Sequence, residues 1–381
     1  MKRSLALACA AVALGAGSGS ALAQTKFDVT LGGDVFFQAG YVDQDLDAGL
    51  RSTEMRNRFR FVLTPTAKAD NGLEYGARIR VRADNTNTAG RTLTQDRSYI
   101  FARGAFGTIQ AGTINGPSDE YGFIGPNIEG IAGGADNLTL DFLSGSPVYD
   151  TYGSGTGIAA RAQNFRNLTS GNAATRVNYL TPTFGGFQGA ISYMPRSDDA
   201  QNSIQRSKFG AGFEDVIEVG GIYSREFGAV TLEASAFYEF GDAMQLSATG
   251  PDFKSLNSYN IAANVGFAGF KVGAMYRDAG KSGYQKGAIA GGADGQETWI
   301  VGANYTIGPV ILAANYQRYE DAGDPSVAGN SWLDLYQAGV TYTVAPGLTA
   351  GLEYSYFKAR ENDAGLRDKG SIIMLDTRLA F

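Results

Sequence analysis

Apolar and polar residues alternate with a period of two along most of the chain. In residues 27–38 the odd positions are mainly apolar and the even positions mainly polar, with Phe36 as the exception. The same alternation recurs at 298–307 and at 348–356. Successive side chains of a β-strand point to opposite faces, so each segment predicts a strand with one apolar and one polar face. No sustained run has the spacing of three and four residues that an amphipathic helix needs.

The segments between the predicted strands alternate between short and long. Glycine supplies the positive φ that tight hairpins need, and short glycine-bearing turns occur at 70–72, 104–107, 184–186, 227–228, 268–269, 308–309 and 345–347. Longer polar stretches occupy 42–53, 85–94, 113–173, 196–214, 242–256, 280–295, 321–331 and 362–369. Such asymmetry is typical of a transmembrane antiparallel β-barrel with short periplasmic turns and long extracellular loops, here of about sixteen strands.

Phenylalanines gather where predicted strands meet the short turns. They are Phe184, Phe187, Phe227, Phe267 and Phe270. Aromatic residues at strand ends are typical of a girdle at a membrane interface, whereas the core of a soluble sheet would hold them in mid-strand. The last predicted strand is amphipathic and the sequence stops at Phe381. We interpret this terminal aromatic as the signal that barrel-assembly machinery recognises.

The first residues predict export. Lys2 and Arg3 precede an apolar run at 5–16, and small residues at 20–23 precede Gln24. This order predicts a secretory signal peptide over 1–23, since the run is too short to span a bilayer. Cys9 lies inside that segment, so residues 24–381, predicted to form one barrel domain, contain no cysteine.

Charge and composition exclude several function classes. Without Lys2 and Arg3, 30 basic residues remain against 38 acidic ones, a net charge of −8. This balance argues against a nucleic-acid-binding protein, which would normally be basic. The chain has no histidine, so Ser-His-Asp hydrolysis and histidine-ligated zinc are excluded. The sequence predicts no enzyme and no required cofactor.

Two adjacent predicted strands carry arginine at alternate positions. These residues are Arg56, Arg58 and Arg60 on one strand and Arg78, Arg80 and Arg82 on the next. A basic side chain facing lipid costs about 2–4 kcal/mol at the middle of the bilayer, so all six are expected to face the interior of the barrel. The hairpin between the strands is expected to place the two columns side by side. Like charges packed side by side repel one another, so the arrangement gives a purely structural protein no stability and favours a functional role for the arginines.

Several motifs, in this order, resemble the general bacterial porins, a family of sixteen-stranded trimeric barrels. Residues 58–77 are similar to the second hairpin of that family, 97–112 to its fourth and fifth strands, and 177–187 to the strand pair after its third loop. Together with Phe381 the resemblance covers nearly the whole chain after residue 23. It implies a homotrimer in contact with lipid and lipopolysaccharide of the outer membrane.

In that family the third extracellular loop folds into the barrel and narrows it. The stretch 113–173 is the longest loop here and is expected to play this part. Its aromatic content favours an ordered loop over a disordered insertion. The resemblance adds Arg97 to the two columns of arginines, and together these seven residues are called the basic wall. The loop supplies carboxylates from Asp119, Glu120, Glu129, Asp136 and Asp141.

The sequence therefore predicts a channel for passive diffusion of ions and small polar solutes. Basic wall and acidic loop would create a transverse electric field at the constriction. The first alternative is a substrate-selective porin for an anionic nutrient, and the second a surface adhesin or structural barrel. Asp43, Asp45 and Asp47 in the first loop are weak candidates for Ca²⁺, against the interpretation that they form a solvated acidic face. The sign of the ion selectivity stays open.

Overall fold

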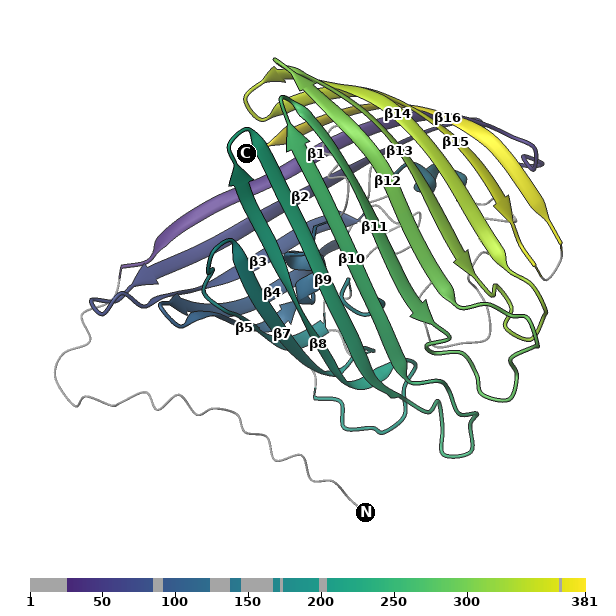
Figure 1. The fold of residues 1–381 in the computed structure, drawn as a ribbon, viewed down its shortest axis with the longest axis horizontal. Coiled ribbons are helices and arrows are strands. Elements are labelled where there is room, and N and C mark those ends of the chain that lie inside the picture. The colour runs from purple at the N-terminus through teal and green to yellow at the C-terminus, as the bar shows by residue number, and fades with distance from the viewer. Residues whose placement is uncertain are drawn as a thin grey trace.

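The computed structural model describes residues 26–84, 92–123, 138–144, 167–171, 174–198, 204–362 and 365–381. Within these ranges the chain forms an antiparallel sheet closed on itself (Figure 1). The strands are β1 (Asp28–Gln44), β2 (Thr53–Lys68), β3 (Glu74–Asp84), β4 (Thr92–Gly104), β5 (Gly107–Ile114), β6 (Ala174–Leu180), β7 (Phe187–Arg196), β8 (Phe213–Phe227), β9 (Val230–Ala243), β10 (Leu256–Phe267), β11 (Phe270–Gly280), β12 (Gln296–Ile307), β13 (Val310–Asp321), β14 (Ser331–Ala345), β15 (Leu348–Arg360) and β16 (Arg367–Ala380). The barrel of about sixteen strands predicted from the sequence is confirmed. Short turns and long loops follow one another along the chain, as expected.

The barrel closes between its first and last strands. β1 pairs with β2 on one side and with β16 on the other, and Val35 lies opposite Leu379. The backbone of Phe381 extends this pairing, because its N–H and C=O both bond to Gly33. A Cβ at Gly33 would lie 2.9 Å from the Phe381 ring and 2.4 Å from the Arg60 carbonyl oxygen, so glycine permits the close approach. Closure leaves no free sheet edge.

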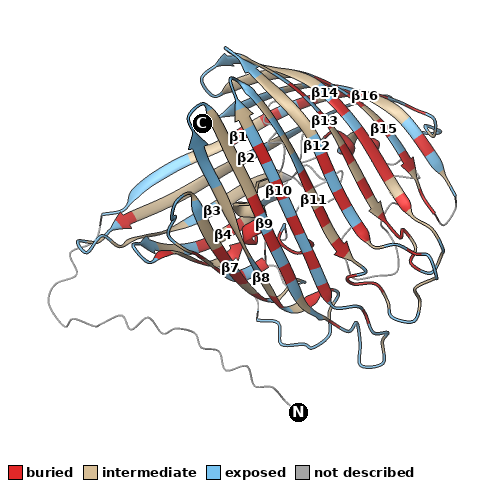
Figure 2. Ribbon diagram, in the orientation of Figure 1, coloured by how far each residue is buried: buried red, intermediate tan, exposed pale blue. Residues whose placement is uncertain are grey.

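Burial alternates along the strands as the pattern of apolar and polar residues predicted. In β10 every second residue is buried over most of the strand, and Figure 2 shows the same alternation on its neighbours. On these strands the buried positions are largely polar and face the barrel interior, whereas the exposed positions are mainly apolar and face lipid. The phenylalanines predicted at the short turns are exposed on this outer surface, Phe184 to 87%. No helix among the described residues is long and apolar enough to cross a bilayer.

A second group of aromatic residues lies on the outer surface, nearer the long loops. Trp299, Tyr316, Tyr336 and Tyr356 come from four successive strands, β12 to β15, and neighbouring rings lie 4.8–6.3 Å apart. With the phenylalanines at the short turns, they form the two aromatic girdles that bound the lipid-facing band of a barrel.

Candidate functional site

The six arginines of β2 and β3 share the interior face of the barrel, but the two columns are staggered. Arg60 lies directly opposite Arg82, whereas Arg80 lies opposite Val62. The two columns lie on neighbouring strands, as the hairpin predicted, but the register set by the turn between Lys68 and Glu74 leaves a single directly opposed pair. Arg78 lies beyond this overlap, toward the short turn, and is exposed.

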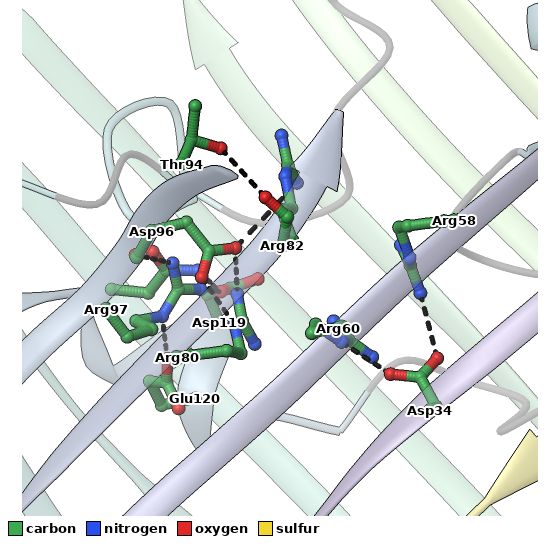
Figure 3. A network of polar contacts seen from close by, with 11 residues as sticks. Asp34, Arg58, Arg60, Arg80, Arg82, Thr94, Asp96, Arg97, Asp119 and Glu120 are labelled. Atoms are coloured by element: carbon green, nitrogen blue, oxygen red, sulfur yellow. Dashed lines mark hydrogen bonds and ion pairs between the residues drawn. The ribbon is translucent and has the colours of Figure 1, made fainter. Parts of the chain in front are cut away.

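A carboxylate on β1 balances one end of this wall. Asp34 lies opposite Arg60 in the sheet, 2.6 Å from its Nε, and 3.3 Å from a guanidinium nitrogen of Arg58 (Figure 3). Arg378 on β16 approaches the same carboxylate at 3.5 Å. Asp34 is only 4% exposed, so three basic groups share one buried anion. The sequence placed Asp34 on the polar face of its strand, but it gave no sign of the register that brings the residue to Arg60.

A β-bulge supplies the second carboxylate of the wall. On β4, Arg97 lies opposite Arg80 and Gln95 lies opposite Val81, which leaves Asp96 as the extra residue. The bulge turns two successive residues toward the interior, where strict alternation would allow one. Asp96 accepts hydrogen bonds from Nε and Nη2 of Arg80, both at 2.7 Å. Because β4 begins at Thr92, Arg97 lies well within the strand.

The exception to the alternation in β1 has a structural reason. Phe36 faces the interior and is 3% exposed. The guanidinium carbons of Arg58 and Arg56 lie 4.6 Å and 5.3 Å from the centre of its ring. An aromatic face attracts a cation at these distances, so the Phe36 ring helps to hold these two arginine side chains in place beside β1.

Three of the five predicted loop carboxylates lie against this wall. Glu120, in the short helix α1 (Pro117–Glu120), accepts a hydrogen bond of 3.0 Å from Arg97, and Asp119 lies 3.8 Å from the same guanidinium. Asp141, in the 3₁₀ helix η1 (Leu138–Leu143), pairs with Arg56. The other two, Glu129 and Asp136, lie outside the described residues. The described parts of the loop thus meet the wall at its two ends, at Arg97 and at Arg56.

The two ends of the loop are fastened to the opposite wall by buried carboxylates that the sequence analysis missed. Glu218 on β8 and Glu239 on β9 lie directly opposite each other, and both are almost completely buried. Glu218 accepts hydrogen bonds from the Ser118 N–H (3.2 Å), from Asn167 (3.0 Å) and from Ser170 (3.1 Å). Glu239 accepts bonds from the N–H and the hydroxyl of Thr169. Glu218 therefore joins the outgoing limb of the loop to its returning limb.

Close packing accompanies these bonds. A Cβ on Gly116 would lie 2.1 Å from a carboxylate oxygen of Glu218 and 2.6 Å from Arg176, so the loop needs glycine to enter here. Arg176 is itself buried and donates to the Thr169 carbonyl oxygen at 2.9 Å. Beyond α1, Tyr121 donates to Gln110 at 2.7 Å. Burial and the neighbouring Glu120 raise the pKa of the Tyr121 hydroxyl, so it remains a donor.

The middle of the loop lies against β1, β15 and β16, away from the strands β8 and β9 that hold its two ends. Leu140 and Leu143 of η1 are buried in an apolar cluster with residues of β1 and β16. Phe142 occupies the space above Gly40 of β1, where a Cβ would come within 2.4 Å of its ring. The Thr139 hydroxyl donates to the buried Glu353 of β15. The loop therefore folds into the barrel, as the resemblance implied, and divides its interior.

The three aspartates suggested for Ca²⁺ are not gathered into a site. Asp43 and Asp45 are exposed at alternate positions at the end of β1 and face outward, and Asp47 lies in the following turn. The Asp45 carboxylate lies 3.8 Å from Lys369. Among the residues that the structure covers, no group of three potential ligands could hold a metal ion. These three aspartates therefore do not form a three-carboxylate metal site in the described structure.

Basic and acidic side chains gather on this part of the interior face. Arginines on it include the six of β2 and β3 together with Arg97 and Arg378. Carboxylates on it include Asp34, Asp96, Asp119, Glu120 and Asp141, and Asp376 of β16 lies opposite the buried Gln38 on the same face. Fixed charges at close quarters in a water-filled passage can attract one sign of ion and orient polar solutes.

Comparisons with known proteins point to one family. The chain is 22% identical over 228 residues to a porin of Fuscovulum blasticum, covering 57% of this chain and 71% of that protein. It is 23% identical to an uncharacterised protein of Rickettsia conorii, with 94% of each covered. A mutant of the Rh. blastica porin has the same fold at a TM-score of 0.55 and 15% identity, covering 93% of this chain and all of the other. A loop-deletion mutant of OmpT, an outer membrane protein of Vibrio cholerae, matches at a TM-score of 0.59 and 12% identity, covering 93% and 99%.

The family model described as Gram-negative porin matches residues 8–362. That match spans nearly the whole chain, and the closed barrel of sixteen strands agrees with it. The resemblance found in the sequence is thereby confirmed, and with it a place in the outer membrane and a channel in preference to an enzyme. The chain belongs to the Gram-negative porin family.

Proposed function

We propose that this porin is a water-filled channel through which ions and small hydrophilic solutes diffuse passively, filtered by size and by a transverse field. One contact carries the proposal: Arg97 of the wall faces Asp119 and Glu120 of the inward loop at 3.8 Å and 3.0 Å. The contact holds the acidic limb of the loop against the basic wall, while Arg78 and Arg82 of the wall stay exposed to the lumen. Hydrated polar solutes align with such a field, whereas apolar solutes would have to displace ordered water.

A preference for anions is the second candidate, and the unequal charges of the constriction favour it. Six arginines share the interior faces of the two neighbouring strands β2 and β3, and two of the carboxylates paired with them, Asp34 and Asp96, lie on the adjacent strands β1 and β4. Arg78 and Arg82 are the most open of the arginines on β3. Guanidinium groups bind carboxylate and phosphate well, so a solute carrying either group would be favoured.

Reconstituted protein tests the channel directly. Vesicles containing the protein should swell in small sugars and progressively less in larger oligosaccharides, and planar bilayers should show stepwise increases in current. Protein-free vesicles are the control. The absence of both swelling and current steps would contradict the proposal and favour the adhesin or structural barrel.

Three further expectations belong to this proposal. The cleaved signal peptide over 1–23 lies outside the described residues, and it stays a prediction. The homotrimer and its contact with lipopolysaccharide rest on family resemblance. Recognition of Phe381 by assembly machinery also stays a prediction, supported by the exposed ring of that residue on the closing strand.

A further inference from the structure

The basic wall continues on β3 and β4 as a group of one arginine and two aromatic rings, nearer the short turns. Arg78 lies directly opposite Tyr99, and Gly76 lies directly opposite Phe101. Ile100, between the two aromatic residues, is 66% exposed to lipid, so Tyr99 and Phe101 face the interior. Because Gly76 has no side chain, the tip of the Phe101 ring lies over it, 2.8 Å from where a Cβ would stand. Guanidinium and rings are therefore neighbours on the lumen side.

Arg78 differs from the other arginines of the basic wall in its partner. The other six all lie within 3.8 Å of a carboxylate oxygen. Arg78 has no carboxylate partner within the described ranges. Its guanidinium donates to the Tyr99 hydroxyl, and the residue is exposed to the lumen. A neutral hydroxyl leaves the charge of Arg78 unbalanced, so this is the position of the wall most open to an anion from solution.

The polar groups around Phe101 already have partners of their own. The guanidinium carbon of Arg103 lies 5.5 Å from the centre of the Phe101 ring, and Arg103 is paired with Glu74. On the other side, Gln110 of β5 lies opposite Phe101 and accepts a hydrogen bond of 2.7 Å from Tyr121 of the inward loop. Phe101 and Tyr121 are both partly exposed, so they present aromatic surface to the lumen beside Arg78.

The spacing of charge and ring fits a small planar anion. Arg78 and Phe101 are diagonal neighbours on adjacent strands, and such pairs lie about 7–8 Å apart. A solute with one ring and one carboxylate can reach across this distance. Its carboxylate would take both forks of the guanidinium, and its ring would gain the attraction that aromatic pairs have beyond the burial of apolar area. A saturated acid of the same size would lack this second contribution.

We propose that Arg78, Tyr99, Phe101 and Tyr121 form a subsite for aromatic carboxylates on the short-turn side of the constriction. Arg78 binds the carboxylate, the Tyr99 hydroxyl orients the guanidinium, and the rings of Phe101 and Tyr121 contact the ring of the solute. The inference rests on the proposed channel, and it gives the preference for anions a class of solute. Binding is expected to be weak, because a solute that passes through must leave the subsite as well as enter it.

The test uses full-length protein in an uncharged detergent and in planar bilayers. The probes are benzoate, cyclohexanecarboxylate and acetate at matched ionic strength, because the first two share size and charge but only benzoate is aromatic. R78Q and F101L are compared with R225Q and F106L. These controls remove the same residue types from exposed positions outside the subsite.

Ligand-observed NMR titration, with protein-free micelles as the blank, should show that wild type and both controls bind benzoate about threefold more tightly than cyclohexanecarboxylate. R78Q should bind benzoate about tenfold more weakly, because a charge-assisted hydrogen bond is lost. F101L should weaken benzoate about threefold and leave acetate as in wild type. F101Y keeps the ring and should bind benzoate as wild type does. In bilayers, benzoate should cause brief blocks of the wild-type current.

Three results would overturn the inference. They are equal binding of benzoate and cyclohexanecarboxylate by wild type, unchanged benzoate binding in F101L, and equal weakening in the two controls. Conductance in KCl is recorded on every sample. A wild type that conducts without distinguishing benzoate would refute only this subsite, whereas a wild type that binds benzoate but does not conduct would refute only the channel.

Discussion

An Asp34→Ala variant is expected to lose about 2 kcal/mol of unfolding free energy, because it removes the shared partner of three arginines, two of them largely buried, which then repel one another. Arg58, Arg60 and Arg378 all lie within 3.5 Å of this carboxylate. They come from β2 and β16, the two neighbours of β1, so the charge also joins the strands that close the barrel. Urea unfolding of the detergent-solubilised protein, followed by tryptophan fluorescence and electrophoretic mobility, gives the difference.

Asp28→Ala provides the matched control for this prediction. Asp28 begins the same strand and is exposed, so its loss should change stability by less than about 0.5 kcal/mol. Asp34→Asn keeps a side-chain oxygen as an acceptor and should fall between the two. Equal unfolding midpoints for Asp34→Ala and Asp28→Ala would show that the arginine wall does not depend on Asp34.

Glu218→Ala is expected to free the two limbs of the long inward loop, residues 113–173, and to change the single-channel current. The substitution removes the shared acceptor of Ser118, Asn167 and Ser170. A buried donor left without a partner costs about 1–3 kcal/mol, so the limb that carries Asp119 and Glu120 should lose its fixed position against Arg97. The open-channel current should become noisy and larger on average, and the change should appear in planar bilayers at constant voltage.

Two variants show whether the effect belongs to the loop. Glu218→Gln retains one carbonyl acceptor and should give a smaller change. Glu226→Ala removes an exposed carboxylate from the short-turn end of the same strand and should leave the current as in wild type. Quiet current of normal size from Glu218→Ala would contradict the view that this carboxylate positions the loop.

Local sequence patterns predicted most of the fold. Alternation at positions such as 298–307 set which side chains face lipid, and glycine at the short turns separated the two kinds of connection. Both patterns depend only on residues that are neighbours in the sequence. The exception at Phe36 was also visible in the sequence, although its reason, two arginines stacked on the ring, depends on the neighbouring strand.

The candidate site was predicted only in part, because its missing members depend on register and on contacts between distant residues. The arginine columns follow from parity and the lipid penalty. Asp96 faces inward only because of a bulge in β4, which no pattern in the sequence marks. Glu218 meets Ser118 across 100 residues of chain, so its role as a loop anchor follows from the folded barrel alone.

The central claim is that the arginines of the wall set which ions pass. The reversal potential in a KCl gradient tests it most directly, in wild type, in an R78Q/R82Q variant and in an R206Q/R225Q control that removes two exposed arginines away from the constriction. A unit charge about 4 Å from an ion in water changes its free energy by about 1 kcal/mol, or about fivefold in partition. Wild type and control should prefer chloride, and the R78Q/R82Q variant should move toward potassium by about fivefold in permeability ratio. An unchanged ratio in R78Q/R82Q, or an equal shift in the control, would contradict the account.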